Sequence, residues 1–399
     1  MNTILNPKAL LCAFGVIGFL GTHGRTGADG STALISNALE SPNPYNLPGT
    51  HSALHKTFTG LPPVDFIISM LVLFWWETID GSHPATSAIG LYFLGQLLPC
   101  IVITYLNALR GNKPSLVKPT LWLTLFQIGS VGATSFIWAL AYTMRSPTTH
   151  AILEPQVLQI SSLISCLDYA WLLVPALLLG YVLPAFLMGL PPTLVSNTFT
   201  QYALAAWNMY PAVVSVLLYL LRTVFARFIR RPAAEHGEST LVKAKSPTRE
   251  AETSHLHAVR VTTIATLVLS STMHLFIVGL SITTLLFPSI FKPAYVNELS
   301  PRAIFIPPVA PGPRALTPGD GVRGFLLWDQ VAGYSTVLLV VLLELRGALK
   351  AAQGLGSKAP TPSAWIIGAL GVGLSLVLGP GSACLVASWA RDEILFGNW

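Results

Sequence analysis

The stretch FWWETIDGSHP, residues 74–84, holds three groups that could exchange protons: Glu77, Asp80 and His83. Because Glu77 and Asp80 stand three positions apart, a continuing helix would bring both carboxylates to one face. Two carboxylates held close together in a poorly solvated site do not both ionise easily, so one keeps its proton near neutral pH. A neutral carboxylic acid can protonate a weak base such as an alkene or an epoxide, with His83 as a second donor.

These three residues also fit a purely structural role. Asp80 and Gly81 would turn the chain at a membrane surface, Glu77 would cap the helix, and His83 would be an ordinary loop residue. The sequence leaves both interpretations open.

Two other acids stand among aromatic residues. Asp168 lies in SCLDYAWLLVP, three positions before Trp171, and Asp329 lies in GFLLWDQVAGY, directly after Trp328. Aromatic faces attract cations, so an acid with aromatic walls suits a reaction that passes through a carbocation. The structural alternative is a carboxylate near a helix N-terminus, with the aromatic residues at a membrane interface.

These motifs give two groups of candidate residues. The candidate catalytic acids are Glu77, Asp80, Asp168 and Asp329. The candidate substrate- or cation-stabilising residues are Trp75, Trp76, His83, Trp171 and Trp328.

Other ionisable residues in apolar stretches have structural explanations. His274, alone within LVLSSTMHLFIVGL, is predicted to hydrogen-bond to a neighbouring helix. Glu344 and Arg346, near a helix end, are predicted to form local surface pairs. Asp65 follows Pro62 and Pro63 and is predicted to be a first-turn acid.

The composition indicates whether these groups lie in a water-soluble protein or in a membrane protein. Of the 399 residues, 52% are hydrophobic and only 10% are charged, whereas ordinary globular domains carry roughly 25% charged residues. Apolar runs near 20 residues recur, each long enough to cross roughly 30 Å of hydrocarbon as a helix. Backbone groups in lipid must be bonded within the segment, and no strand alternation is present, so the spans are helical.

The sequence therefore predicts an all-α fold, a polytopic transmembrane helical bundle that forms a single integral membrane domain over residues 1–399. The short run Ala9–Leu20 favours a retained helix but suits a signal-peptide core almost as well. With it, the predicted spans number about eight or nine. The other runs are 61–79, 84–109, 120–144, 167–190, 201–225, 259–287, 323–346 and 363–390.

Three segments between the runs are predicted to be loops. Residues 22–60 form a polar loop, and residues 222–257 form a basic, flexible loop that the positive-inside tendency assigns to the cytoplasm. Residues 288–322 are so rich in proline that helix is excluded over most of them, and such a loop can cap an opening in the bundle. The short basic loop at Arg110 should share the cytoplasmic side, but the span count puts it opposite unless 151–190 crosses twice.

Several function classes are excluded by what the sequence lacks. The net charge is +6, and the basic residues lie in short loops, where they indicate membrane topology. No nucleic acid partner is therefore predicted. There is no G-x-S-x-G, H-E-x-x-H, Walker or dinucleotide-binding motif. No aspartate-rich run exists to hold magnesium against a diphosphate. We therefore predict no metal and no cofactor, which leaves metal-free acid chemistry or no chemistry at all.

The FWWETIDGSHP motif, the SAIGLYFLGQ helix that follows it, the length and the many-span layout resemble the membrane-bound terpene cyclases of the AscI/MacJ type in fungal meroterpenoid biosynthesis. The resemblance implies cyclisation of a prenyl chain, usually farnesyl, on an aromatic or polyketide-derived head. Members of that family begin by protonating an epoxide or an olefin and are thought to need no metal. The D-x-D-D acid motif of soluble class II cyclases is absent, so Glu77 and Asp80 would supply the proton.

The expected partners are thus a prenylated small molecule and the lipid bilayer, and the expected location is the endoplasmic reticulum membrane. The main alternative is a proton-coupled transporter or channel, in which membrane acids carry protons. Internal symmetry and acids at mid-span depth would favour that alternative, but no repeat is visible and the acids lie mostly near span ends.

Overall fold

The computed structural model describes residues 6–146, 149, 155–228, 248–309, 312–354 and 361–397. Over these ranges the chain is helical and forms no strand beyond two isolated bridges, Asn46–Ala53 and Arg110–Ile164. The all-α prediction is confirmed.

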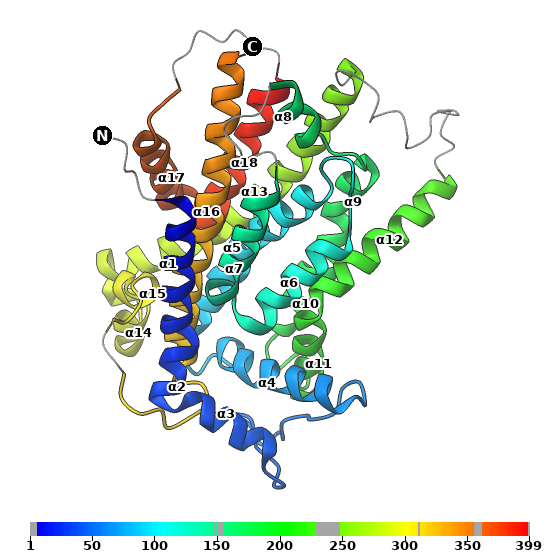
Figure 1. Ribbon diagram of the computed structural model, residues 1–399. Helices are drawn as coiled ribbons and strands as arrows, with labels where there is room; N and C mark the ends of the chain where they lie inside the picture. Colours follow the sequence, from blue (N-terminus) through cyan, green and yellow to red (C-terminus); the bar gives the residue numbers. More distant parts are fainter. Residues whose placement is uncertain are drawn as a thin grey trace.

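Most of the described residues belong to helices, which follow one another closely in the sequence (Figure 1). Two π-helical turns, Leu20–Gly24 and Leu178–Val182, join α1 to α2 and α9 to α10. The α-helices are α1 Pro7–Phe19, α2 Arg25–Asp29, α3 Ser31–Glu40, α4 Pro62–Ile79, α5 Pro84–Ala108, α6 Val117–Gly129, α7 Val131–Arg145, α8 Pro155–Ser162, α9 Leu167–Leu177, α10 Leu183–Met188, α11 Asn197–Asn208, α12 Tyr210–Phe228, α13 Arg249–Leu286, α14 Pro293–Glu298, α15 Pro301–Phe305, α16 Val322–Gly354, α17 Ala364–Leu378 and α18 Pro380–Phe396.

Among the described residues, five helical segments are long and apolar enough to cross a membrane: α4, α5, α9 with α10, α13 and α16. A sixth is the pair α11 and α12, which is bent by 71°. This is fewer than the eight or nine spans predicted, because α1 has only 13 residues and two other predicted spans are each broken into two shorter helices.

The first broken run is 120–144, where α6 and α7 form a hairpin. Gln127 of α6 donates a hydrogen bond to Asn208 at the end of α11, with a nitrogen–oxygen distance of 2.6 Å. Thr120, two turns earlier, pairs with Ser215, which lies farther along α12. The helix α6 therefore runs antiparallel to α12.

Ser130 reverses the chain between these two helices. Its φ of 70° lies in the left-handed region, which non-glycine residues rarely adopt. From there α7 follows α16 in parallel, since Gly132 at its start contacts Asp329 and Tyr142 near its end donates a hydrogen bond to Glu344. The segment thus enters the bundle and returns toward the end from which it came.

The second broken run is 363–390, where α17 and α18 pack against each other and against α16. Gly379 joins them with a φ of 94°, a conformation that favours glycine. The buried Gln96 side chain of α5 accepts hydrogen bonds from the backbone N–H groups of Gly381 at 3.0 Å and Ser382 at 3.3 Å. The first turn of α18 is therefore capped from inside the bundle.

The α6–α7 hairpin removes the conflict between the two basic segments. Arg110 pairs with Asp392 in α18, and His255, near the start of α13, lies 3.9 Å from the same carboxylate. Both basic segments are therefore at one end of the bundle. Of the predicted loop 222–257, both margins belong to α12 and α13, and 229–247 lie outside the described residues.

The other two predicted loops contain more helix than expected. In 22–60, α2 and α3 extend to Glu40, separated by Gly30 with a φ of 89°. In 288–322, two short helices each begin with a proline, Pro293 and Pro301. Proline suits the first position of a helix because its missing N–H would have no partner there.

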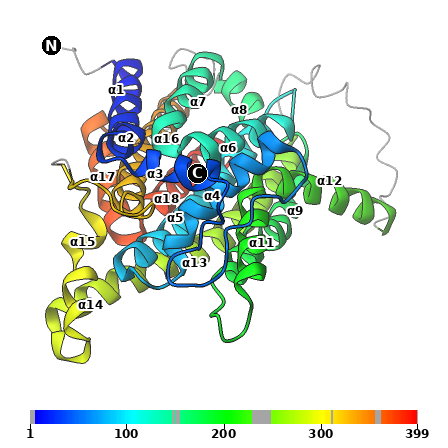
Figure 2. The ribbon, with the colours of Figure 1, turned by 90° about the horizontal axis from the view of Figure 1, so that it is seen from below.

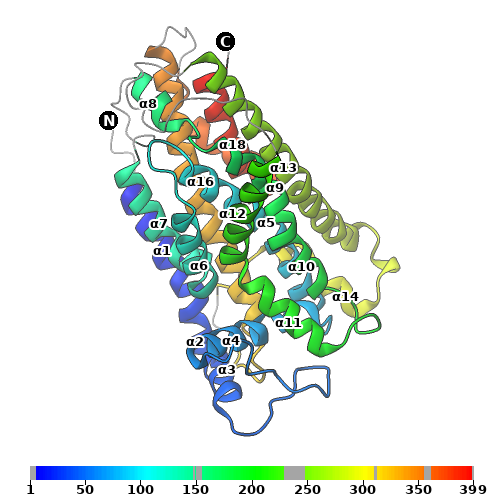
Figure 3. The same cartoon turned by 90° about the vertical axis from the view of Figure 1, so that its right-hand side faces the viewer.

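The long helices run side by side, and α2, α3 and α4 lie across one end of them (Figures 1 and 3). Figure 2 looks onto this end, where the three helices cover the bundle behind them. Although α4 was predicted to be a span alongside the others, it lies crosswise and closes this end.

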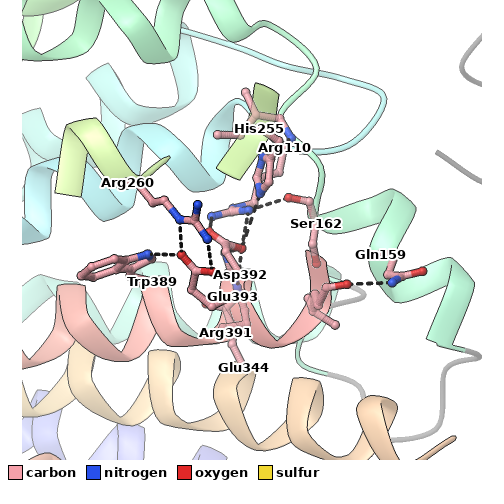
Figure 4. A network of polar contacts seen from close by, with 12 residues as sticks. Arg110, Gln159, Ser162, His255, Arg260, Glu344, Trp389, Arg391, Asp392 and Glu393 are labelled. Atoms are coloured by element: carbon pink, nitrogen blue, oxygen red, sulfur yellow. Dashed lines mark hydrogen bonds and ion pairs between the residues drawn. The ribbon is translucent and has the colours of Figure 1, made fainter. Parts of the chain in front are cut away.

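A charged cluster occupies the opposite end and consists of Arg110, Glu344, Arg391 and Asp392 (Figure 4). Arg110 Nη2 lies 2.7 Å from Asp392 Oδ2, and Arg391 Nη1 lies 2.8 Å from Glu344 Oε1. All four side chains are buried. The prediction of a surface pair at Glu344 is wrong, because α18 brings Arg391 to it within the bundle.

We expect Asp392→Asn to destabilise the fold by about 3–5 kcal/mol, because it leaves the buried Arg110 without its carboxylate partner, while Arg391 keeps only Glu344. Thermal unfolding in detergent measures this. The matched control is the neighbouring Glu393→Gln, whose partner Arg260 has a side chain that is 47% exposed. That change should cost no more than about 1 kcal/mol. Equal losses for both variants would contradict a special role for the charged cluster.

The same carboxylate predicts a pH dependence. Burial alone would raise the pKa of Asp392, but the charges of Arg110 and Arg391 hold it well below the ordinary value. In the unfolded chain this carboxyl binds a proton near pH 4, so its contribution to stability is complete above that pH and is lost as the pH falls further. Below about pH 5, the melting temperature of the wild type should therefore fall more steeply than that of Asp392→Asn.

Candidate functional site

A cavity of about 170 Å³ lies at the end of the bundle that α2, α3 and α4 cover. It is bounded by these helices, by the turn between α6 and α7, and by the start of α16. An apolar cavity of about 150 Å³ accommodates benzene, so this one has room for part of an apolar ligand. Its aromatic wall consists of Phe66, Phe74, Trp75, Phe93, Phe126 and Phe325.

The start of α16 supplies both apolar lining and an acid. Val322, Phe325, Leu326 and Asp329 all line the cavity, at the spacing of one helix face. Asp329 is the acid, and only 3% of it is exposed. Its Oδ1 accepts a hydrogen bond from the backbone N–H of Gly132 at 2.5 Å. The acid is therefore fixed at the first turn of α7, whose positive end favours a carboxylate.

Glu77 lies beside the cavity, behind its lining. It follows Phe74 by one turn of α4 and is only 1% exposed. Its Oε2 accepts no hydrogen bond from any residue in the described ranges, and His83 Nε2 lies 3.5 Å from it. A methyl group on Gly319 would overlap the Glu77 carboxyl. The segment 317–321, which we call the strap, therefore lies directly on this acid.

The strap carries a further acid, Asp320. Burial would raise the pKa of its carboxyl, but hydrogen bonds from the backbone N–H groups of Thr317 and Leu316, at 3.0 Å and 2.7 Å, bring it below the ordinary value. The Asp320 carboxylate thus holds the strap in a tight turn. Its charge acts on Glu77 together with that of Asp80.

Asp80 occupies the structural position that the sequence left open. It ends α4, and its carboxylate accepts hydrogen bonds from the backbone N–H and the hydroxyl of Ser82, at 3.0 Å and 2.6 Å. His83 has a side chain that is 51% exposed. Neither Asp80 nor His83 lines the cavity, although both are close to Glu77.

Several predicted site residues lie away from the cavity. The indole N–H groups of Trp76 and Trp328 donate hydrogen bonds to the carbonyl groups of Pro48 and Pro308. These two tryptophans therefore hold loop segments. Of the predicted residues, the cavity lining contains Trp75 and Asp329.

Asp168 and Trp171 also lie outside the cavity, on α9. The Asp168 carboxylate is 3.5 Å from the guanidinium of Arg222. Trp171 is 40% exposed and packs against the ring of His257. Asp168 lies in the first turn of α9, where the helix dipole favours a carboxylate.

The sequence reasoning missed seven polar residues of the lining: His23, Thr26, Ser31, Thr32, Ser36, Gln127 and Ser130. His23 pairs with the carbonyl of Gly129 at 3.1 Å, and its ring meets that of Phe325 edge-on. No spacing in the sequence connects these residues to Asp329, because separate segments bring them together. Within the described ranges, no three His, Cys, Asp or Glu side chains gather closely enough to hold a metal ion.

The prediction for His274 is confirmed. Its Nδ1 lies 3.0 Å from the hydroxyl of Tyr92 on α5, and its Nε2 lies 3.1 Å from the carbonyl of Leu376 on α17. It thus links three helices and lies outside the cavity lining.

A family model described as the CtvD domain matches residues 7–396, almost the whole chain. The chain belongs to the CtvD-domain family. This membership confirms the resemblance drawn from the FWWETIDGSHP region. No solved structure matches the chain.

The CtvD-domain protein is similar to several curated fungal proteins. It is 27% identical to the terpene cyclase ctvD of Aspergillus terreus over 225 residues, which cover 55% of this chain and 61% of that protein. It is 24% identical to the terpene cyclase ascI of Acremonium egyptiacum over 342 residues, 85% of this chain and 80% of that protein. With the terpene cyclase janA of Penicillium janthinellum, 25% identity extends over 48% of this chain and 52% of that protein. The chain thus spans less than two thirds of the ctvD and janA proteins.

Contact between the strap and Glu77 yields a prediction for Gly319→Ala. The added methyl group would overlap the Glu77 carboxyl, and such overpacking typically costs about 1–3 kcal/mol. Thermal unfolding in detergent measures the loss. In a Glu77→Ala background the overlap is gone, so Gly319→Ala should then cost much less. An equal cost in both backgrounds would show that Glu77 is not the group that Gly319 accommodates.

Proposed function

We propose that this CtvD-domain protein is a membrane-bound terpene cyclase. It closes rings in the prenyl chain of a meroterpenoid precursor by protonating an epoxide or an olefin. The names of the similar fungal proteins support the reaction class. The observation that carries the proposal is the buried Asp329 carboxyl in the lining of a cavity with aromatic walls.

The reaction needs an acid whose proton reaches the substrate. The acid O–H bond breaks, and its proton goes to the epoxide oxygen, whose bond to one ring carbon then opens, or to an alkene carbon. Either route leaves a cation on the prenyl chain. The π electrons of a neighbouring alkene then form a carbon–carbon bond to that cation. Loss of a proton, or capture by a nucleophile within the molecule, ends the sequence, so the product has the mass of the substrate.

We assign the first proton to Asp329, because it lines the cavity and the other three candidate acids do not. The hydrogen bond from Gly132 orients one oxygen and stabilises the carboxylate that remains after proton transfer. Glu77 is the second candidate, since it is buried directly behind the strap. Asp80 and Asp168 are engaged by Ser82 and Arg222 outside the cavity.

The aromatic wall would protect the cation until the sequence ends. Trp75 and Phe93 lie with ring centroids 5.7 Å apart, and Phe74 and Phe325 with centroids 5.0 Å apart. Such faces attract positive charge without reacting as bases. The surrounding side chains also exclude water, which would otherwise capture the cation early.

The substrate proposed is a prenylated aromatic or polyketide-derived molecule. A chain of this kind partitions into a bilayer, and the five or six long apolar helices of the described residues suit an integral, multi-pass membrane protein. We propose the endoplasmic reticulum as its compartment.

Expression in a host fed farnesylated phenols and their epoxides tests the function, with ring-closed products of unchanged mass as the readout. Asp329→Asn keeps an oxygen that accepts the Gly132 hydrogen bond but cannot donate the proton, so we expect turnover to fall at least about a hundredfold. The control is Asp168→Asn, which should cyclise at close to the wild-type rate.

Glu77→Gln separates the two buried acids. If it abolishes cyclisation while Asp329→Asn remains active, the proton donor is Glu77. If both variants cyclise normally, neither residue is the acid. If the wild type consumes no prenylated compound, the cyclase proposal is wrong, and proton-coupled flux in reconstituted vesicles becomes the next measurement.

A further inference from the structure

The two ends of the cavity differ in exposure and chemistry. At one end, Thr32 of α3 and Phe66 of α4 are exposed, so the cavity opens between these helices. At the other end, Trp75, Phe93 and Asp329 are each less than 5% exposed. We call these the mouth and the blind end. A long ligand must therefore leave one of its ends at α3.

The mouth carries hydroxyl groups on one face of α3. Thr32 and Ser36 are four residues apart, so their side chains lie one above the other, and both line the cavity. The Thr32 hydroxyl donates to Thr26 at 3.1 Å and still has its own lone pairs. Ser36 is half-buried, and its hydroxyl makes no hydrogen bond to any residue that the structure describes. Together the pair offers one donor and several acceptors.

The acid lies away from the hydroxyl groups along α16. Gly321, directly before α16, contacts Ser31 and Thr26 on the hydroxyl side. Asp329 comes seven residues after Val322, the first residue of α16, which corresponds to roughly 10 Å along the helix axis. Apolar residues line the interval, among them Phe325 and Leu326. The cavity thus has hydroxyl groups at the mouth, a mainly apolar lining along its length and an acid at depth.

We propose that Thr32 and Ser36 bind the polar head group of the substrate at the mouth, so that the prenyl chain enters tail first and its far end meets Asp329. The inference rests on the proposed function and names the part of the site that selects the head. At the blind end the polar lining groups already have partners: Gln127 bonds Asn208, His23 pairs with the Gly129 carbonyl, and Asp329 accepts from Gly132. A hydroxyl- or carbonyl-bearing head buried there would therefore replace few of the hydrogen bonds that it makes to water. At α3 the head keeps them, and the apolar chain fills the apolar interval.

The test compares two substrates on two variants, Thr32→Val and Ser36→Ala. One substrate is a farnesylated phenol, and the other carries the same head with its hydroxyl groups replaced by hydrogen. For the hydroxylated head, each variant should raise KM about three- to tenfold, the effect of one hydrogen bond. For the deoxygenated head KM should stay unchanged, and kcat should stay unchanged for both, because α3 does not touch the reacting end.

Asn37→Ala is the matched control, since Asn37 is exposed on the same helix and does not line the cavity. It should change KM for neither substrate. If Thr32→Val and Ser36→Ala alter both substrates equally, their role is structural and the inference is overturned. It is also overturned if neither variant alters KM while the wild type cyclises the hydroxylated substrate. A wild type that cyclises no prenylated compound instead refutes the proposed function itself.

Discussion

The hydrogen bond from the Gly132 N–H to the Asp329 carboxylate joins the tip of the α6–α7 hairpin to α16. Both partners are buried, so the contact holds the hairpin at one depth within the bundle. The hairpin tip and the start of α16 form two walls of the cavity, and α2, α3 and α4 form the others. The cavity therefore depends on this contact for its shape as well as for the orientation of its acid.

The two ends of the bundle are stabilised by different forces. The charged cluster joins α16, α18 and the end of α5 through buried ion pairs. At the cavity end, packing is mainly apolar, and the closing helices α2 and α3 are short. Elements with few buried contacts open most readily. We therefore expect substrate entry to involve α2, α3 and the strap, while the charged cluster stays intact.

Composition and apolar periodicity were sufficient to predict an all-helical fold and most of the long helices, because burial in lipid requires an unbroken helical backbone. The hairpins could not be predicted, since Ser130 and Gly379 interrupt runs that remain apolar on both sides. Asp329 was identified as an acid among aromatic residues, but its partner Gly132 is almost 200 positions away. The motif around Glu77 indicated a buried acid. It could not show that the strap, which is far away in the sequence, lies directly on this acid at the side of the cavity.

The α17–α18 hairpin offers a comparison for the acid at the tip of the α6–α7 hairpin. Each tip brings a helix N-terminus into the protein interior, where its N–H groups need acceptors. For α18 a neutral amide, Gln96, is sufficient. At the start of α7 the acceptor is instead a carboxyl group, that of Asp329, which is costlier to bury than an amide. A glutamine or asparagine would accept the backbone hydrogen bond equally well, so the fold alone does not require an ionisable group at this position.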